Sequence, residues 1–206
     1  RAMEDGALGL STSLIYVPDN YASTEEIIAL ARVAARYGGS YITHQRNEDD
    51  TIDQSLDEVV RIAPEAAIPA RQHHLKTAGK PNFGEMPAVL KRIEAARAEG
   101  LDVTADQYPW TASSNNLDAS LPVWVREGGA DKLVERLRDP ATRARAREDF
   151  IKEHQPFWPE HAGEILVTSV LNLDLKKYEG KTVADIAKAE GKDPVDVLMH
   201  VVIADH

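Results

Sequence analysis

Residues 40–74 read SYITHQRNEDDTIDQSLDEVVRIAPEAAIPARQHH, and this segment carries a complete strand–helix–strand pattern. Its two ends, 40–44 and 67–74, are short apolar runs with the length and β-branched content of strands. Between them, apolar residues recur at helical spacing, and the helical pattern stops near Pro64. The segment therefore predicts one β/α/β unit whose two strands run parallel.

The same pattern continues on both sides of this unit. Further strand-like runs lie at 7–15 and 101–106, and successive strand ends recur about thirty residues apart. The sequence Ser23-Thr-Glu-Glu26 predicts a capping box at the start of one helix, and Pro87 suits the first turn of another. We therefore expect an α/β fold with four consecutive β/α units in residues 1–112. This periodicity alone fits both a flat doubly wound sheet and a barrel.

The strand–helix rhythm fails after residue 112. We expect residues 113–163 to form a helical insertion or lid, and residues 164–206 to return to a strand and helices associated with the barrel. The elements expected in this part are a helical region at 121–150, a loop at 154–163, a strand at 165–170, and helices at 182–190 and from Pro194 onward.

Composition and charge limit the classes of function. Hydrophobic residues make up 43% and charged residues 28% of the 206, which is ordinary for a globular protein. The formal charge of −10 argues against nucleic acid as the main partner, and no apolar run approaches the ~18 residues of a membrane-spanning helix. The absence of cysteine excludes disulfides and a thiol nucleophile within this chain. We expect a small-molecule partner and a cytoplasmic location.

The ends of the chain predict a central piece of a longer polypeptide. The sequence starts at Arg1 and stops at His206, directly after the apolar run 195–203. An isolated barrel piece exposes sheet edges and apolar surface, so we expect the chain alone to be inactive and to self-associate.

Polar side chains stand where three of the predicted strands end. His44 and His74 close two neighbouring strands, and Asp106 closes the next. Functional residues of parallel β/α folds gather at these carboxyl ends, and neighbouring strands lie ~4.8 Å apart, so two inward-pointing imidazoles can share one ion. Zinc binds neutral imidazole, and in catalytic sites it keeps an open position for a water molecule that it activates. The pattern therefore fits a shared metal ion and fits two structural histidines equally well; with the resemblance described below, we expect zinc, as one or two divalent ions.

Strand parity extends this hypothesis to the neighbouring residues. His73 and His74 are successive, which predicts opposite faces of the strand, so only one of them can join His44. Lys76 shares the parity of His74 and could hold an anion beside the metal, although its position alone favours an ordinary surface lysine. We interpret the nearby Arg46 and Glu48 as a local salt bridge that shapes the loop.

The remaining polar groups at the strand ends allow more than one interpretation. Asp106 could be a metal ligand or a base, although we prefer a role as acceptor of loop N–H groups. Tyr16 and Tyr108 both follow strand ends near prolines, where they could form ring walls or donate hydroxyl hydrogen bonds to a substrate.

Several motifs, taken together and in this order, resemble the N-acyl-D-amino-acid deacylase (D-aminoacylase) family of the amidohydrolase superfamily. The resemblance runs from about residue 3 to the end of the chain. It implies a partial (β/α)8 TIM-type barrel from a metal-dependent enzyme that hydrolyses N-acyl-D-amino acids to a D-amino acid and a carboxylate. The matching stretches are GALGLSTSLIYVP (6–18), YITHQRNE (41–48), HLK (74–76), NFG (82–84), AARAEGLDVTADQYP (95–109), YEGKT (178–182) and GKDPV (191–195).

The resemblance also implies roles for single residues. His44 and His74 match the two zinc-binding histidines on successive strands of the family. Lys76 and Tyr108 match positions around the substrate carboxylate and the reacting carbonyl, where Tyr108 would help to stabilise the oxyanion. Tyr16 matches another tyrosine on the substrate side. Ser113 and Ser114 complete the expected set of substrate-binding residues.

Other parts of the family's site have no counterpart in these 206 residues. A His-x-His pair and a cysteine ligand lie upstream in the family, and an aspartate base and a substrate-binding arginine lie downstream. Two alternatives therefore stay open: a cyclic-amide hydrolase of the same superfamily, or a non-catalytic binding protein that keeps the barrel scaffold. The motifs around Tyr16 and Tyr108 favour the deacylases.

Overall fold

The computed structural model describes residues 1–155, 158 and 160–206. Contacts between residues divide the chain into two compact units, Arg1–Ser113 and Ser114–His206. The two units are described separately below. Within the described residues, no helix has the length and apolar character needed to cross a membrane.

The first unit is a parallel sheet with helices in the connections. Its strands lie in the order β1-β2-β3-β4, which is also their order along the chain. The strands are β1 (Gly9–Ser13), β2 (Ser40–His44), β3 (Ala70–Gln72) and β4 (Val103–Ala105), and the helices between them are α1 (Thr24–Ala35), α2 (Ile52–Ala66) and α3 (Met86–Ala98). Two 3-10 turns, Asp19–Tyr21 and Lys80–Asn82, lie in the connections.

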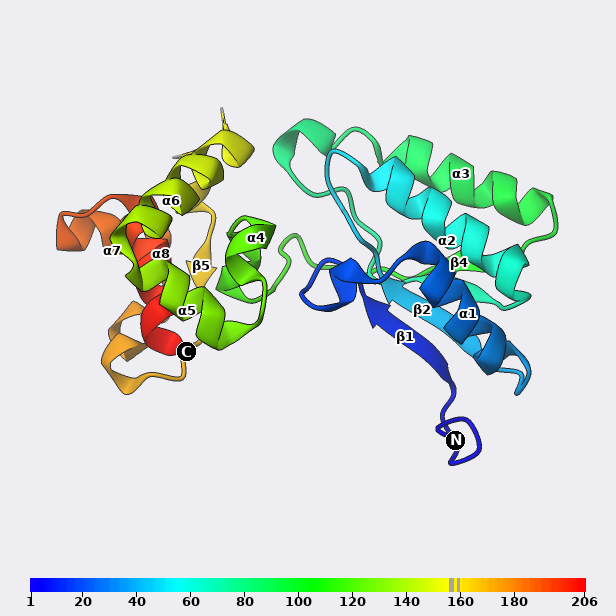
Figure 1. Cartoon of the computed structure of the whole chain (residues 1–206). Helices are drawn as coiled ribbons and strands as arrows, with labels where there is room; N and C mark the ends of the chain where they lie inside the picture. Colours follow the sequence, from blue (N-terminus) through cyan, green and yellow to red (C-terminus); the bar gives the residue numbers. More distant parts are fainter. Residues whose placement is uncertain (156–157, 159) are drawn as a thin grey trace. The chain divides into compact units, whose positions relative to one another are not determined.

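The arrangement of the helices separates a barrel from a doubly wound sheet. Figure 1 shows α1, α2 and α3 together on one face of the sheet. Right-handed crossovers that always step to the next strand place every helix on the same face, whereas a doubly wound sheet carries helices on both faces. The first unit is thus a partial β/α barrel, and the prediction of the fold class is confirmed.

Helix signals in the sequence locate the starts of helices better than their ends. Helix α1 begins after Ser23, whose hydroxyl accepts the Glu26 N–H at 3.2 Å, which is one of the two hydrogen bonds of the predicted capping box. Helix α2 does not stop at Pro64 but runs to Ala66, and Ala67 closes it with a left-handed φ of 52°. Proline lacks the N–H that would bond to the preceding turn, and its ring crowds the carbonyl four residues earlier, so α2 continues only two residues past Pro64.

The core of the first unit fills the layer between the sheet and its helices. Apolar stripes of the helices pack on strand residues that point to the same side. Fully buried members include Ile27 and Ala31 of α1, Leu56 and Ile62 of α2, Val89 of α3, and Tyr41 and Val103 of the strands. This layer fixes the strands whose ends carry the polar groups.

The second unit is mainly helical. Its helices are α4 (Val123–Arg126), α5 (Ala130–Arg138), α6 (Pro140–His154), α7 (Val183–Glu190) and α8 (Pro194–Asp205), with 3-10 turns at Leu117–Ser120, Glu160–Gly163 and Leu173–Tyr178. The predicted helical region at 121–150 is divided among α4, α5 and part of α6. The predicted strand at 165–170 is only β5 (Leu166–Val167), which pairs antiparallel with β6 (Lys181–Thr182). The predicted loop at 154–163 includes residues 156, 157 and 159, which lie outside the described residues.

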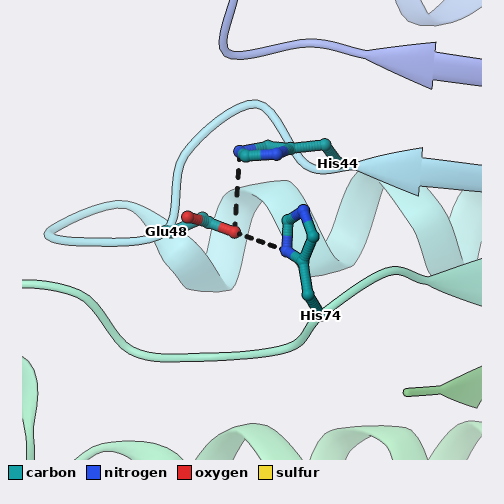
Figure 2. A group of neighbouring side chains, drawn as sticks. All are labelled: His44, Glu48 and His74. Carbon is teal, nitrogen blue, oxygen red and sulfur yellow. Dashed lines mark ion pairs between the residues drawn. The ribbon is translucent and has the colours of Figure 1, made fainter. Parts of the chain in front are cut away.

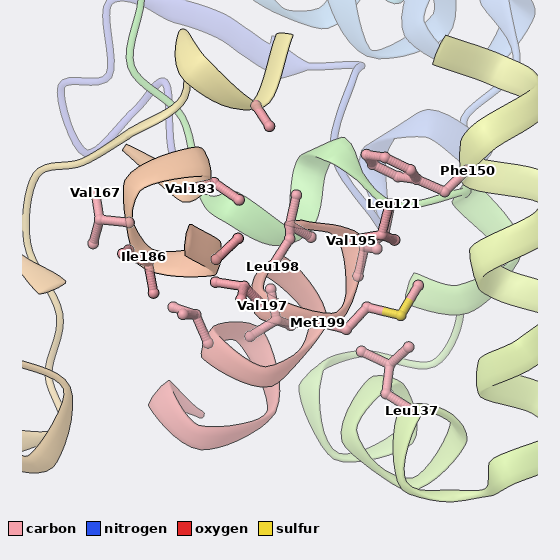
Figure 3. Packing of buried hydrophobic residues seen from close by; sticks show 14 of the residues in the cluster. Leu121, Leu137, Phe150, Val167, Val183, Ile186, Val195, Val197, Leu198 and Met199 are labelled. Atoms are coloured by element: carbon pink, nitrogen blue, oxygen red, sulfur yellow. The ribbon is translucent and has the colours of Figure 1, made fainter. Parts of the chain in front are cut away.

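One hydrophobic core holds the second unit together. Figure 3 shows Leu137 of α5, Phe150 of α6 and Leu198 of α8 in a single cluster, which extends from Leu121 to Val202. The division after Ser113 lies next to the boundary expected at residue 112. Residues on both sides of 163 share this core, so the expected lid and the expected return to the barrel form one compact unit. Their assignment as lid and barrel segments stays a prediction.

Candidate metal centre

The carboxyl ends of the four parallel strands lie side by side at one end of the sheet. Ser13 lies opposite His44, and Gln72 lies opposite Ala105 in the strand register. Beyond β3 the ladder continues, because the Leu75 N–H donates to the Asp106 carbonyl at 2.8 Å. The residues that follow each strand are therefore neighbours in space, as the sequence predicted.

His44 and His74 converge at this end of the sheet. Their ring centroids lie 4.4 Å apart and the ring planes are nearly perpendicular, at 79°. Their side chains are 15% and 19% exposed, so both rings are largely shielded from water. His44 Nε2 is buried and has no hydrogen-bond partner among the residues that the structure describes. A buried ring nitrogen without a hydrogen-bond partner is suited to a metal ion.

Glu48 is the third member of this group, and sequence reasoning missed it. Its Oε1 lies 3.6 Å from His44 Nε2 and 3.3 Å from His74 Nδ1. Figure 2 draws these two contacts as dashed lines. The Glu48 side chain is only 7% exposed. One ligand atom from each of the three residues lies within 4.8 Å of the others. Two imidazoles and one carboxylate are a ligand set that zinc and related divalent ions favour.

The expected salt bridge between Arg46 and Glu48 is wrong. Arg46 instead forks onto Glu58 of α2, with Nη2 and Nε lying 2.9 and 3.1 Å from its two carboxylate oxygens. It also donates to the carbonyls of Asn20 and Ala22. The Arg46 side chain therefore anchors the loop from outside, while Glu48 turns toward the histidines.

Asn47 shapes the bend that places Glu48. Its side-chain oxygen accepts the N–H groups of Asp49 and Thr51, and its own N–H donates to the Ser55 hydroxyl. Side-chain bonds of this kind fix a loop locally. The sequence offered only the spacing of four residues between His44 and Glu48, and in a loop that spacing does not determine direction.

The protonation states of the group suit metal binding. Burial, together with the nearby His74 and Lys76, lowers the pKa of His44 to about 4, and burial likewise lowers the pKa of His74. Both imidazoles are therefore neutral near pH 7, as metal ligands must be. Burial raises the pKa of Glu48, and the Lys76 ammonium opposes that effect. The residues present thus fit a divalent ion.

Asp106 holds the backbone of His74, which confirms its predicted role as an acceptor. Its Oδ1 accepts the His74 N–H at 2.7 Å, and His73 Nδ1 lies 2.9 Å from the same carboxylate oxygen. Burial alone would raise the pKa of Asp106, but these contacts with His74 and His73 lower it overall. His74 adopts a left-handed φ of 39°, a sparsely populated conformation that its neighbours must stabilise.

The parity argument for His73 and His74 is wrong in its premise. Strand β3 ends at Gln72, so both histidines lie in a turn, and their ring centroids are 4.4 Å apart rather than on opposite faces. Its conclusion still holds among the described residues, because only His74 joins the group with His44 and Glu48.

Lys76 lies directly against this group. Its Nζ is 2.6 Å from Glu48 Oε1 and 3.0 Å from His74 Nδ1, and it lies 5.8 Å from the centroid of the Tyr108 ring. The side chain is 20% exposed. Lys76 is therefore beside the candidate metal centre, with its charge paired to Glu48.

The two predicted tyrosines flank the histidines. The Tyr16 ring centroid lies 5.4 Å from that of His44, and the Tyr108 centroid lies 6.4 Å from that of His74. Burial and the charge of Glu48 raise the pKa of Tyr108, while a hydrogen bond with the Ser113 side chain opposes this. Ser113 is exposed, and Ser114 is exposed at the start of the second unit. The substrate contacts of all four residues stay predictions.

Comparison with known proteins identifies similar sequences. No family model matches the chain. A D-aminoacylase of Alcaligenes xylosoxydans xylosoxydans is 44% identical over 117 residues, and an N-acyl-D-glutamate deacylase of the same organism is 40% identical over 116 residues. These matches cover 57% and 56% of this chain but 24% of each relative. The chain therefore spans about a quarter of the length of the curated relatives that it matches.

Solved structures extend the similarity to nearly the whole chain. A D-aminoacylase structure described as defining a novel subset of amidohydrolases matches with a TM-score of 0.69 and 31% identity. An N-acyl-D-glutamate deacylase from Bordetella bronchiseptica, complexed with zinc and a phosphonate mimic of the tetrahedral intermediate, matches with a TM-score of 0.71 and 27% identity. Each match covers 97% of this chain and 34% of the solved chain. These findings confirm the resemblance to the D-aminoacylase group of amidohydrolases.

Proposed function

We propose that this chain supplies two metal-binding histidines to an enzyme that hydrolyses the amide bond of N-acyl-D-amino acids, releasing a D-amino acid and a carboxylate. The observation that carries the proposal is the convergence of His44, His74 and buried Glu48 at the ends of neighbouring parallel strands. Support comes from the similarity to deacylases, one of them solved with zinc.

The proposed cofactor is zinc, as one or two divalent ions, with His44 and His74 as ligands. Such an ion supplies Lewis-acid chemistry: it polarises a carbonyl and makes a water molecule nucleophilic at neutral pH. The contribution of this chain is two imidazoles held neutral by burial. Glu48 adds a negative charge that favours a cation in the same place.

The proposed substrate contacts are arranged around the metal group. Lys76 would bind the amino-acid carboxylate as a point charge and so orient the amide. Tyr108 carries its hydroxyl proton at neutral pH, as tyrosines ordinarily do, and its raised pKa keeps it so; it can therefore donate a hydrogen bond to the developing oxyanion. Tyr16 would form a wall beside His44, and Ser113 would contact the substrate near Tyr108. Ser114 is the other proposed substrate contact.

The test removes each histidine from the native protein. His44→Ala and His74→Ala should each lose bound zinc and lower the rate of deacylation of N-acetyl-D-amino acids by about a hundredfold or more. His161→Ala, which removes an exposed histidine of the second unit, should change neither. Undiminished zinc content and rate in either site variant would reject the assignment. Turnover of hydantoins in place of N-acyl amino acids would favour the cyclic-amide alternative.

We also propose that the isolated chain self-associates through its sheet. Strands β1 and β4 are the two edges, and no further strand pairs with them among the described residues. The apolar side chain of Leu8, directly before β1, is 89% exposed. Unpaired edges of this kind promote association. Sedimentation of the purified chain as a monomer at micromolar concentration would contradict the proposal.

The remaining expectations about partners and location also stand as proposals. The formal charge of −10 supports the proposal that nucleic acid is not the main partner, because an acidic protein repels the phosphate backbone. A cytoplasmic location and the absence of a membrane partner stay predictions, and fractionation of the cells that make the protein would test both.

A further inference from the structure

The Lys76 ammonium occupies a position that a metal ion would need. Its Nζ contacts two of the three candidate ligands, lying 2.6 Å from Glu48 Oε1 and 3.0 Å from His74 Nδ1. It also lies 3.4 Å from the His74 carbonyl oxygen. The lysine thus makes a cationic contact with the same Glu48 oxygen that lies 3.6 Å from His44 Nε2.

One nitrogen lone pair cannot serve both cations. A neutral imidazole has a single acceptor nitrogen, which either accepts an N–H hydrogen bond or binds a metal. A zinc ion on His74 Nδ1 would lie at ~2.0–2.1 Å from it, inside the space between that nitrogen and Lys76 Nζ. Lys76 therefore has to leave His74 Nδ1 before an ion can bind through that atom.

Charge balance gives the reason for the position of Lys76. The Glu48 side chain is 7% exposed, and a buried carboxylate without a cationic partner is costly. Lys76 provides that partner at 2.6 Å, and a divalent ion bound to Glu48 would provide it equally well. A lysine and a divalent ion held together there would repel each other strongly in a site with little water.

We infer that Lys76 is a built-in competitor of the metal ion: it holds the cation position between Glu48 and His74, and ion binding displaces it toward the substrate carboxylate. This inference rests on the metal site proposed above. It assigns Glu48 as the anion that the two cations share.

If the ion displaces Lys76, binding of the ion and binding of the substrate are cooperative. While Lys76 is paired with Glu48, its charge is neutralised and it is a weak site for a carboxylate. Once displaced, it keeps a position near the Tyr108 ring, whose centroid is already 5.8 Å from Nζ. Binding of the ion therefore creates the anion site, so the ion binds first and the substrate second.

The test measures zinc affinity rather than activity. Metal-depleted native protein is titrated with zinc in competition with a chromophoric chelator. Lys76→Met should tighten zinc binding by about tenfold or more, because the competing cation is gone, whereas Glu48→Gln should weaken it by about tenfold. Lys91→Met is the matched control, since it removes the charge of an exposed lysine on α3, and it should leave the affinity unchanged.

A second measurement needs no variant and avoids any folding defect. Acetic anhydride labels lysine amines, and mass spectrometry follows each site separately. Lys76 should be acetylated several times faster in the presence of zinc than in its absence, and Lys91 should react at the same rate in both. Equal rates at Lys76, or slower labelling with zinc, would overturn the inference.

The outcomes separate this inference from the proposed function. If the wild-type protein binds no zinc, the proposed function fails and the inference fails with it. If the wild-type protein binds zinc, His44→Ala abolishes binding and Lys76→Met leaves the affinity unchanged or lowers it, the proposed function stands and the competitor role is wrong.

Discussion

The candidate metal centre contains a buried polar atom that lacks a hydrogen-bond partner among the described residues. That atom is Nε2 of His44. Protonation would place a positive charge beside Lys76 in a site shielded from water, so the neutral ring is strongly favoured. The same neutrality leaves the nitrogen ready for a metal.

The lowered pKa of His44 predicts a specific loss of stability in acid. Its value is about 4 in the folded chain against an ordinary 6.5, so its stabilising contribution is complete above pH 6.5 and is lost as the pH falls toward 4. In metal-depleted protein, the free energy of unfolding measured with urea should be lower at pH 4.5 than at pH 7. Replacing His44 with Asn, which does not titrate, should reduce that decrease by about 1–2 kcal/mol after allowance for solvent screening.

The comparison between wild type and variant is the useful quantity, because carboxylates elsewhere contribute equally to both. Identical decreases in the two proteins would mean that His44 is protonated in the folded chain as easily as in water.

The histidines of the centre could be predicted because they stand at the ends of predicted strands. His44 and His74 follow apolar runs, and parallel strands bring such positions together. The position of the Glu48 side chain could not be predicted, because it depends on the bend at Asn47 and on the pairing of Arg46 with Glu58 instead of Glu48. The bend and the ion pair both arise from three-dimensional contacts, which the spacing of residues in the sequence does not reveal.

At the scale of elements, the close approach of β1 and β2 is a strict requirement of the site. Gly9 lies opposite Ser40 in the register, and a Cβ at position 9 would meet the Ser40 backbone at a separation that real Cβ atoms do not show. Glycine is therefore needed for the two strands to pair. Strand β2 ends at His44, so the pairing also supports the metal group.

Gly9→Ala should accordingly destabilise the first unit by more than about 2 kcal/mol, because backbone rather than a flexible side chain must move. Zinc affinity should fall as well, since β2 carries His44. Gly84→Ala is the matched control: a Cβ there meets nothing within 4 Å, so its effect on stability should be small. Urea denaturation of both variants checks the expectation, and equal stability of the two would contradict it.

The sequence was a better guide to the presence of elements than to their extent. Strand β2 was predicted at its observed bounds, whereas β3 covers only 70–72 of the predicted 67–74. Apolar content suggested a longer strand, but His74 takes a left-handed backbone conformation that ends the extended run. An apolar run indicates which residues are buried. Where the strand ends depends on backbone hydrogen bonds, which cannot be read from residue types.

At the scale of the whole molecule, chain order and helix placement decided what periodicity left open. Sequential strand order with α1, α2 and α3 on one face identifies the first unit as part of a barrel. The second unit has its own core, from Leu121 to Val202. Its single core could not be predicted, because short helices joined by irregular segments carry no signal for which of them pack together.

The central claim is that His44 and His74 hold one divalent ion between them. Crystals of the native protein soaked with zinc and measured at the zinc absorption edge test this claim most directly. The account predicts an anomalous peak at ~2.0–2.1 Å from one ring nitrogen of His44 and one of His74. An anomalous map without a peak between these two rings, under conditions where the protein binds zinc in solution, would contradict it.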